Sequence, residues 1–141
     1  MARENRRSGC PIGIALDTFG DRWTLLIVRD LLFKERRTFK EFADAGEGIA
    51  SNVLADRLNR LVAAGIIERR ADPADGRKAV HHLTEKGFAL APVLVEMVVW
   101  AARHEDTDAP PDEVREMERK RERYLKALRK RWRRSWSADA P

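Results

Sequence analysis

The sequence has little cysteine and no long apolar run. Its single cysteine, Cys10, excludes an intrachain disulfide, and a chain without disulfides suits a reducing cytosol. The longest apolar stretch, residues 88–102, contains Glu96 and Pro92 and falls short of the about 20 residues that cross a bilayer. The basic residues near the N-terminus are not followed by the apolar stretch of a signal peptide. We therefore expect a cytoplasmic protein without membrane contact.

Sites for metals, phosphates and covalent catalysis are also missing from the sequence. His81 and His82 are adjacent in an expected strand, so their side chains point to opposite faces, and His104 is distant. No histidine and cysteine spacing typical of a metal site occurs, and neither a glycine-rich phosphate loop nor a nucleophile motif is present. The sequence thus predicts no cofactor, no metal and no enzyme activity, and it favours a packing role for His81.

What the chain has in abundance is charge. Of its 141 residues, 36% are charged, and the net charge is +5. A positive excess of this kind favours an anionic partner without identifying it. The hydrophobic content of 43% is enough for one domain with a core. The composition therefore indicates a basic globular domain with long solvated helix faces.

The order of elements over residues 49–87 is that of a winged helix. An amphipathic helix over 51–64, capped by Ser51, is followed by two short strands, which turn dipeptides such as Asp75-Gly76 join into a hairpin. A further helix is expected over residues 84–104. In a winged helix one helix enters the major groove of DNA while the hairpin reaches the neighbouring backbone. The sequence predicts a mainly α fold with one small β-hairpin, a winged helix-turn-helix.

One face of the 51–64 helix is suited to reading DNA. Its leucines face the core, so the polar residues lie on or near the opposite face. Asparagine can pair bidentately with adenine. Asp56 either accepts a hydrogen bond from a cytosine amine or pairs with Arg60 at helical spacing. The candidate DNA-binding residues of this helix are Ser51, Asn52, Asp56, Asn59 and Arg60.

Three cations outside this helix complete the expected DNA interface. Arg77 and Lys78 lie in the wing, where a cation can enter the minor groove or meet a phosphate. Lys40 lies in the first turn of the preceding helix, which Thr38 and Glu41 begin as a capping box. For each cation, surface salt bridging is the competing explanation.

A set of spaced residues over positions 10–104 forms a pattern that is specific as a whole, although each piece alone is weak. The set is Cys10-Pro11-Ile12, Gly20-Asp-Arg-Trp23 followed by LLIVRDLL, Thr38-Phe39 with Glu41-Phe42, Gly48-Ile49-Ala-Ser51, Leu54 with Arg57-Leu58, Leu61, Gly65-Ile66-Ile67, Arg69, Leu83-Thr84 with Gly87, Pro92 with Leu94, and Trp100. It resembles the HxlR-type family of bacterial winged-helix transcription regulators.

The resemblance implies a homodimeric DNA-binding regulator whose N-terminal and post-wing helices form the dimer interface. Such regulators often repress nearby genes and respond to small molecules or oxidants. The expected interface residues are Ile12, Leu94, Met97, Val98 and Trp100. The chain departs from the family pattern at His81, where an aromatic residue is usual, and in its wing, which looks more like that of MarR-type regulators.

On this basis the chain divides into four parts. They are a mobile basic N-terminus (1–9), an HxlR-type DNA-binding and dimerisation domain (10–104), a linker (105–111) and a basic amphipathic helix (112–137). The terminal helix allows two interpretations: its arginines contact phosphates nonspecifically, or its apolar stripe packs on the partner subunit as a coiled-coil-like arm. We favour packing.

Cys10 suggests a sensor. Its thiol precedes a helix that begins at Pro11, and it lies near Arg6 and Arg7 in sequence, so the helix dipole and the cations favour the reactive thiolate. The resemblance adds that some HxlR-type proteins sense oxidants or electrophiles with an N-terminal cysteine. The alternative is a small apolar residue inside the dimer contact.

Taken together, the sequence predicts a homodimeric transcription regulator, a repressor of a palindromic operator in double-stranded DNA, that responds to an oxidant, an electrophile or a small ligand. Two alternatives stay open. One is a MarR-like small-ligand sensor, and the other is a winged-helix module that binds protein.

Overall fold

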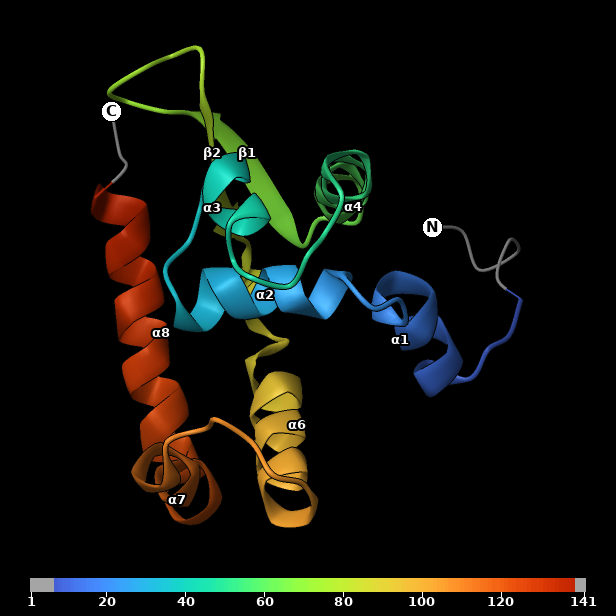
Figure 1. Ribbon diagram of the computed structural model, residues 1–141, viewed down its shortest axis with the longest axis vertical. Helices are drawn as coiled ribbons and strands as arrows, with labels where there is room; N and C mark the ends of the chain where they lie inside the picture. The colour runs from blue at the N-terminus through green and yellow to red at the C-terminus, as the bar shows by residue number, and fades with distance from the viewer. Residues whose placement is uncertain (1–6, 139–141) are drawn as a thin grey trace.

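The computed structural model describes residues 7–138 (Figure 1). Helix α2 crosses the centre of the molecule, with the hairpin, α3 and α4 on one side of it and α6 and α7 on the other, while α8 runs alongside. Helix α1 extends away from this body and buries no residue. The elements are α1 (Pro11–Phe19), α2 (Thr24–Phe33), α3 (Phe39–Ala43), α4 (Ser51–Ala63), β1 (Ile67–Ala71), β2 (Ala79–Leu83), α5 (Glu85–Phe88), α6 (Ala91–His104), α7 (Pro111–Arg119) and α8 (Arg121–Ala138).

These elements confirm the predicted fold class, which is mainly helical with one two-stranded antiparallel hairpin. The hairpin pairs Ile67 with Leu83 at its base and Ala71 with Ala79 next to the loop. An isolated bridge between Thr38 and Val80 ties the start of α3 to the hairpin. None of the helices among residues 7–138 combines the length and apolar character needed to span a bilayer.

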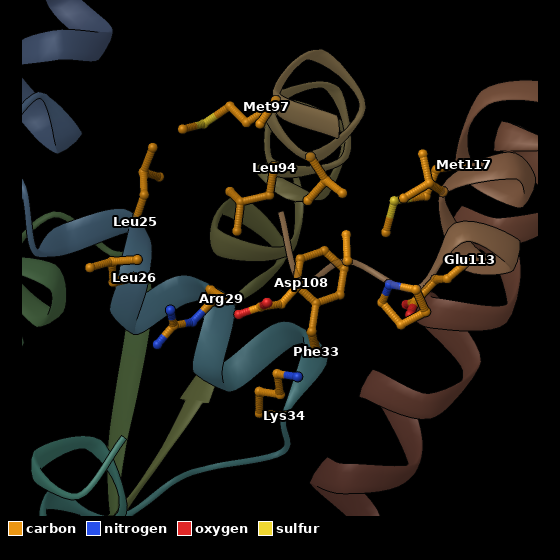
Figure 2. Close-up of a pocket in the computed structure, with 15 residues that line it drawn as sticks. Leu25, Leu26, Arg29, Phe33, Lys34, Leu94, Met97, Asp108, Glu113 and Met117 are labelled. Atoms are coloured by element: carbon orange, nitrogen blue, oxygen red, sulfur yellow. The ribbon is translucent and has the colours of Figure 1, made fainter. Parts of the chain in front are cut away.

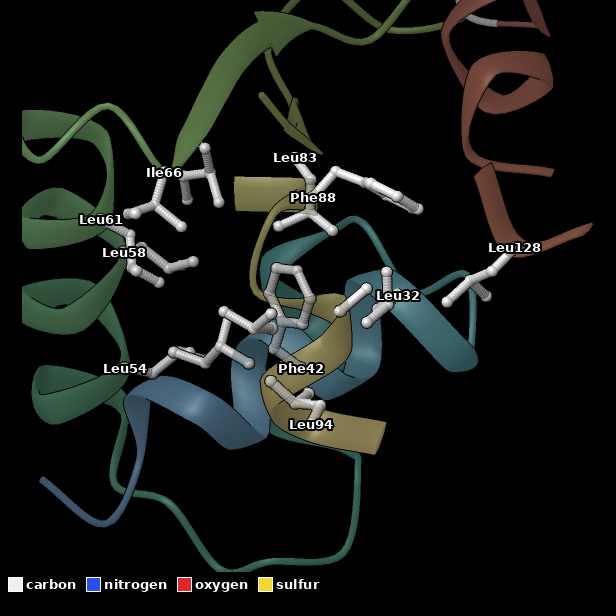
Figure 3. Close-up of a cluster of buried hydrophobic side chains, with 14 residues drawn as sticks. Leu32, Phe42, Leu54, Leu58, Leu61, Ile66, Leu83, Phe88, Leu94 and Leu128 are labelled. Atoms are coloured by element: carbon white, nitrogen blue, oxygen red, sulfur yellow. The ribbon is translucent and has the colours of Figure 1, made fainter. Parts of the chain in front are cut away.

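The hydrophobic core lies where α2, α4 and the hairpin meet (Figure 3). Val28 of α2 and Leu54 of α4 are fully buried there, and Leu83 of β2 is 1% exposed. Leu128 of α8 also belongs to this cluster. Because burying apolar surface is the main stabilising contribution to folding, the shared cluster joins α2, α4, the hairpin and α8 into one core.

The predicted capping box at the start of α3 is confirmed. The Thr38 hydroxyl accepts a hydrogen bond from the Glu41 amide, and the Glu41 carboxylate accepts one from the Thr38 amide. The predicted cap of α4 is wrong by one residue. Ala50 is the N-cap of α4, and Ser51 is its first helical residue, with no side-chain cap. Ala50 has the extended backbone that a cap requires, so Ser51 is left as part of the helix surface.

The single helix expected over residues 84–104 is divided into α5 and α6. Thr84 does cap α5, since its hydroxyl accepts a hydrogen bond from the Gly87 amide. The break comes before Ala91 because Pro92 follows it: proline has no amide to donate to Phe88, and its ring would clash with that carbonyl in a continuous helix.

The single helix expected over residues 112–137 is likewise two helices. The backbone leaves the helical conformation at Lys120, with φ −133° and ψ 46°. Helix α7 packs on α6 through Met117, which is buried with Val95 and Val99. Helix α8 then turns back along the body toward the hairpin (Figure 1).

The favoured interpretation of the terminal helix as an arm packed on a partner subunit is wrong. The apolar stripe of α8 packs on its own chain, where Leu128 is buried and Tyr124 and Trp132 are partly buried against the same core. The break at Lys120 directs α8 back onto the hairpin and α2. The apolar stripe is therefore buried within its own chain and is not available to a partner subunit.

Candidate nucleic-acid interface

Helix α4 buries its leucines and exposes its polar side chains. Leu54, Leu58 and Leu61 are at most 2% exposed, which fixes the rotation of the helix against the body. The opposite face is therefore free for contact with a ligand. All five predicted contact residues of this helix are exposed: Ser51, Asn52, Asp56, Asn59 and Arg60.

The turn before α4 depends on two glycines and one ion pair. Gly46 and Gly48 have φ of 89° and 75°, in the left-handed region that residues with a Cβ rarely adopt. Between them, Glu47 accepts a hydrogen bond of 2.7 Å from Arg29 of α2. The first turn of α4 keeps unpaired backbone amides, which attract phosphate at a helix N-terminus.

A chain of charges fixes α4 to the turn before α2. Arg57 donates to Asp21 at 2.9 Å and also pairs with Asp56, which in turn meets Arg60 at 3.0 Å. Burial of Asp21 opposes its ionisation, but hydrogen bonds from Thr24, Arg57 and two backbone amides outweigh this and lower the pKa of Asp21 to about 2. Of the two roles expected for Asp56, the structure shows the pairing with Arg60.

A second set of hydrogen bonds joins α4 to the hairpin. Arg69 of β1 donates to the Asn59 side-chain oxygen at 2.9 Å and to Nε2 of His81 at 3.3 Å. Nδ1 of His81 lies 2.8 Å from the Arg37 carbonyl. Nδ1 must donate there, because Nε2 accepts from Arg69. The sequence interpretation missed Arg69 as a positioning residue, since its partner is ten positions away on another element.

His81 has the packing role that the sequence favoured. It is 2% exposed, and its ring lies 5.7 Å from that of Phe42. Burial lowers the pKa of His81 more than the bond to the Arg37 carbonyl raises it. A neutral ring, with Nδ1 donating to Arg37 and Nε2 accepting from Arg69, therefore packs beside Phe42. Among residues 7–138, no cluster of three or more histidine, cysteine or acidic residues is placed to hold a metal.

The wing presents its two predicted cations to solvent. The Arg77 side chain is 92% exposed, and its guanidinium lies 3.2 Å from Asp75. Lys78 is exposed, and its carbonyl accepts a hydrogen bond from the Asp72 amide that closes the loop. Lys40 is exposed on α3. For Arg77 the structure thus shows the surface salt bridge that was the alternative to DNA contact. The site is open to solvent, so anions can reach it.

An HxlR-like helix-turn-helix model matches residues 18–109, which include α2, α4 and the β1–β2 hairpin. The chain belongs to the HxlR family. Members of this family are transcriptional regulators and not enzymes, and their helix-turn-helix implies DNA binding. The match ends before α7, so α7 and α8 lie beyond the family's helix-turn-helix region.

Three relatives of this HxlR-family protein are similar to it over most of its length. The HTH-type transcriptional regulator YodB of Bacillus subtilis is 39% identical over 93 residues, covering 65% of this chain and 82% of YodB. The redox regulator HypR in its oxidized form is 27% identical with a TM-score of 0.61, covering 70% of this chain and all of HypR. The structure of PA1607 is 34% identical with a TM-score of 0.66, covering 76% of this chain and 73% of PA1607. YodB structures include diamide-treated and quinone-bound forms.

The residues expected at a dimer interface fall into two groups. Ile12, Met97 and Trp100 are 71%, 51% and 60% exposed, and Val98 is half-buried. Leu94 is only 5% exposed and packs in the core of its own chain (Figure 3), because it lies on the face of α6 turned toward the body. Leu94 is therefore a core residue. The sequence interpretation also missed two exposed apolar side chains beside this group, Leu16 and Val93.

Cys10 is exposed and precedes α1, as expected. Its backbone amide donates to the Ser8 hydroxyl at 3.1 Å. Arg6, invoked as a neighbouring cation, lies outside the described residues, as does most of the N-terminal segment predicted to be mobile. The thiol thus stands at the N-terminal end of a helix and open to solvent.

Proposed function

We propose that this HxlR-family regulator is a repressor that binds a palindromic operator as a homodimer, with one α4 helix in each half-site. The observation that supports this most directly is the exposed polar face of α4 opposite its buried leucines. Asn52 is central to the proposal because a side-chain amide can distinguish adenine by two hydrogen bonds. Two-fold symmetry would place the half-sites about one helical turn of DNA apart, or a multiple of it.

Phosphate contacts in this proposal come from the elements around α4. Lys40 precedes the recognition helix, while Arg77 and Lys78 extend from the wing. Such contacts position a protein on the duplex, whereas base contacts specify the sequence. The pairing of Arg77 with Asp75 leaves the guanidinium solvated, so exchange of this partner for a phosphate costs little desolvation.

The proposed dimer uses α1 and α6. A continuous apolar surface on the exposed side of α6 includes Val93, Met97 and Trp100, and α1 exposes Ile12 and Leu16. A monomer rarely leaves such large apolar side chains in water, and a second copy related by two-fold symmetry would cover both surfaces with the same contacts.

Cys10 is the proposed sensor of oxidants. The relatives YodB and HypR support this: YodB was solved diamide-treated and quinone-bound, and HypR is a redox regulator. In the proposed step, two Cys10 thiols of a dimer form one disulfide, and diamide takes up the two protons and two electrons. Non-reducing gels before and after diamide would test it. A wild-type band that stays monomeric, or a Cys10→Ser variant with the same response, would refute the sensor.

A cavity offers a second route for an effector. About 440 Å³ in volume, it lies between α2, α6 and the segment leading into α7 (Figure 2). Its walls are mainly apolar, with Phe33, Met97 and Val114 among them. The charged residues of the lining are Arg29, Lys34, Asp108 and Glu113. This size and lining suit a small apolar ligand with one polar group. A Val114→Trp variant, which fills the cavity, should lose binding of a fluorescent apolar probe.

A footprint on the DNA upstream of the protein's own coding region tests the proposed function. The wild type should protect a two-fold symmetric site, and Asn52→Ala should abolish the protection while the protein stays folded and dimeric. Ala63→Ser, at an exposed position near the other end of the same helix, is the matched control and should protect as the wild type does. Stable binding to a protein that DNA does not displace would instead support the interaction module.

A further inference from the structure

Helix α8 is held against the hairpin by its aromatic residues. The indole nitrogens of Trp132 and Trp136 both donate to the carbonyl of Leu83, the last residue of β2, at 2.9 and 3.2 Å. Trp136 also stacks on His82, with ring centroids 4.6 Å apart, and Arg70 of β1 lies 4.3 Å from its centroid. The C-terminal end of α8 is therefore fixed beside the wing.

The opposite face of α8 carries a stripe of cations. The spacing of three, four and three or four residues places them on one side of the helix. All five are exposed, and within residues 7–138 none of their side chains makes a hydrogen bond or ion pair. We call this set the α8 cation stripe: Arg123, Lys126, Lys130, Arg133 and Arg134.

The cations on the packed side of α8 behave differently. Arg121 pairs with Glu96, Arg129 with Glu85 and Arg131 with Glu35. The sequence of α8 contains a single carboxylate, Glu122, at its first turn. The acids that could neutralise the helix are thus supplied by other elements and only to its packed side. The α8 cation stripe is left with a concentrated positive charge.

We propose that the α8 cation stripe binds the phosphate backbone of the DNA that flanks the operator beyond the wing. A duplex is the partner that fits, because the C-terminal part of the stripe lies close to the hairpin: Arg133 and Arg134 are within one turn of Trp136, which contacts β1 and β2. Flexible cations that are not held in an ion pair suit phosphates, because their binding releases the counterions of the phosphates. The stripe lies outside the family match, so it extends the interface beyond the shared module.

This inference rests on the proposed operator binding, and a triple variant tests it. Lys130→Gln, Arg133→Gln and Arg134→Gln together remove three charges from exposed positions of the full chain. The matched control removes three exposed cations from the end of the molecule opposite the wing (Figure 1), through Arg115→Gln, Arg119→Gln and Lys120→Gln. Thermal unfolding should be alike for both variants, because all six side chains are exposed.

The readouts are a hydroxyl-radical footprint and a salt titration on a duplex that extends well beyond the protected site. The stripe variant should lose protection at the outer edges only, and the slope of log K against log salt should fall by about 0.9 for each phosphate that is no longer neutralised. The control variant should keep the wild-type footprint and slope. A stripe variant equal to the control would overturn the inference while the operator binding stands, whereas a wild type that protects no site would refute the proposed function itself.

Discussion

Helices α4 and α8 are both amphipathic, but they differ in whether the charged side chains on their exposed faces form ion pairs. Both bury one face, through leucines in α4 and through Leu128 and two tryptophans in α8. On α4 the exposed charges satisfy each other, since Asp56 meets both Arg57 and Arg60. On α8 the cations of the stripe have no partner among residues 7–138. A helix with paired charges leaves discrimination to neutral amides, whereas one with unpaired cations is suited to phosphate. In the proposed complex, α4 therefore provides specificity and α8 provides positioning.

The largest effect should come from the leucine face of α4. Leu54→Ala removes a fully buried side chain and should lower the free energy of unfolding by about 3 kcal/mol through lost burial and the cavity left behind. Chemical denaturation would measure it. Asn52→Ala, on the exposed face of the same helix, should change stability by less than about 0.5 kcal/mol. A small loss for Leu54→Ala would mean that α4 is not anchored as described.

The same truncation in α8 tests whether that helix is an equal part of the core. Leu128→Ala should lower the free energy of unfolding by about 2 kcal/mol, because Leu128 is 5% exposed and belongs to the main cluster. Hydrogen exchange of the hairpin amides should quicken with it. If stability and exchange stayed unchanged, α8 would be only loosely associated with the body in solution, and its stripe would not be fixed beside the wing.

Acid should weaken the attachment of α4 through Asp21. The pKa of Asp21 is lowered to about 2 in the folded protein, against about 3.9 for an unperturbed aspartate. Its stabilising contribution is therefore complete above pH about 4 and is lost as the pH falls toward about 2. We expect an Asp21→Asn variant to have a lower free energy of unfolding than the wild type at neutral pH. Its free energy of unfolding should also fall less than that of the wild type as the pH is lowered, which denaturation across this range would measure. Asp44→Asn, an exposed control, should keep the wild-type profile.

The smallest effect is expected from the wing. Arg77→Ala should weaken binding to all sequences alike and reduce the salt slope by about 0.9 for each phosphate contact that it removes. Its ion pair with Asp75 is solvent-exposed, so stability should not change measurably. A slope that stays the same in the titration would remove Arg77 from the interface.

The sequence predicts mainly those structural features that are determined by residues close together in the chain. The capping box at Thr38 and the wing turn follow from neighbouring residues, and the sequence predicts both. The division of the post-wing helix has a local cause in Pro92, which the apolar periodicity of the segment obscures. The return of α8 depends on contacts such as that between Trp132 and Leu83, 49 positions apart. No periodicity shows such a contact, which is why the sequence favoured a partner subunit for the apolar stripe.

Among the residues expected at the dimer interface, solvent exposure distinguishes core residues from surface residues, which the sequence pattern could not do. Periodicity identifies an apolar helix, but in a helix that is apolar nearly all round it does not tell which side meets the body. Leu94 and Met97 are three residues apart on α6, yet one is 5% and the other 51% exposed. Only the positions of α2 and α7 around the helix decide between them.

The exposed face of α4 is proposed to read base sequence. The most direct measurement is the ratio of affinities for the footprinted site and for a scrambled duplex of equal length, at one salt concentration, for the wild type and Asn52→Ala. We predict that the variant binds the scrambled duplex as the wild type does and loses about 1–3 kcal/mol of preference for the site. An unchanged ratio in Asn52→Ala, with the site still bound, would show that Asn52 on this face does not read base sequence.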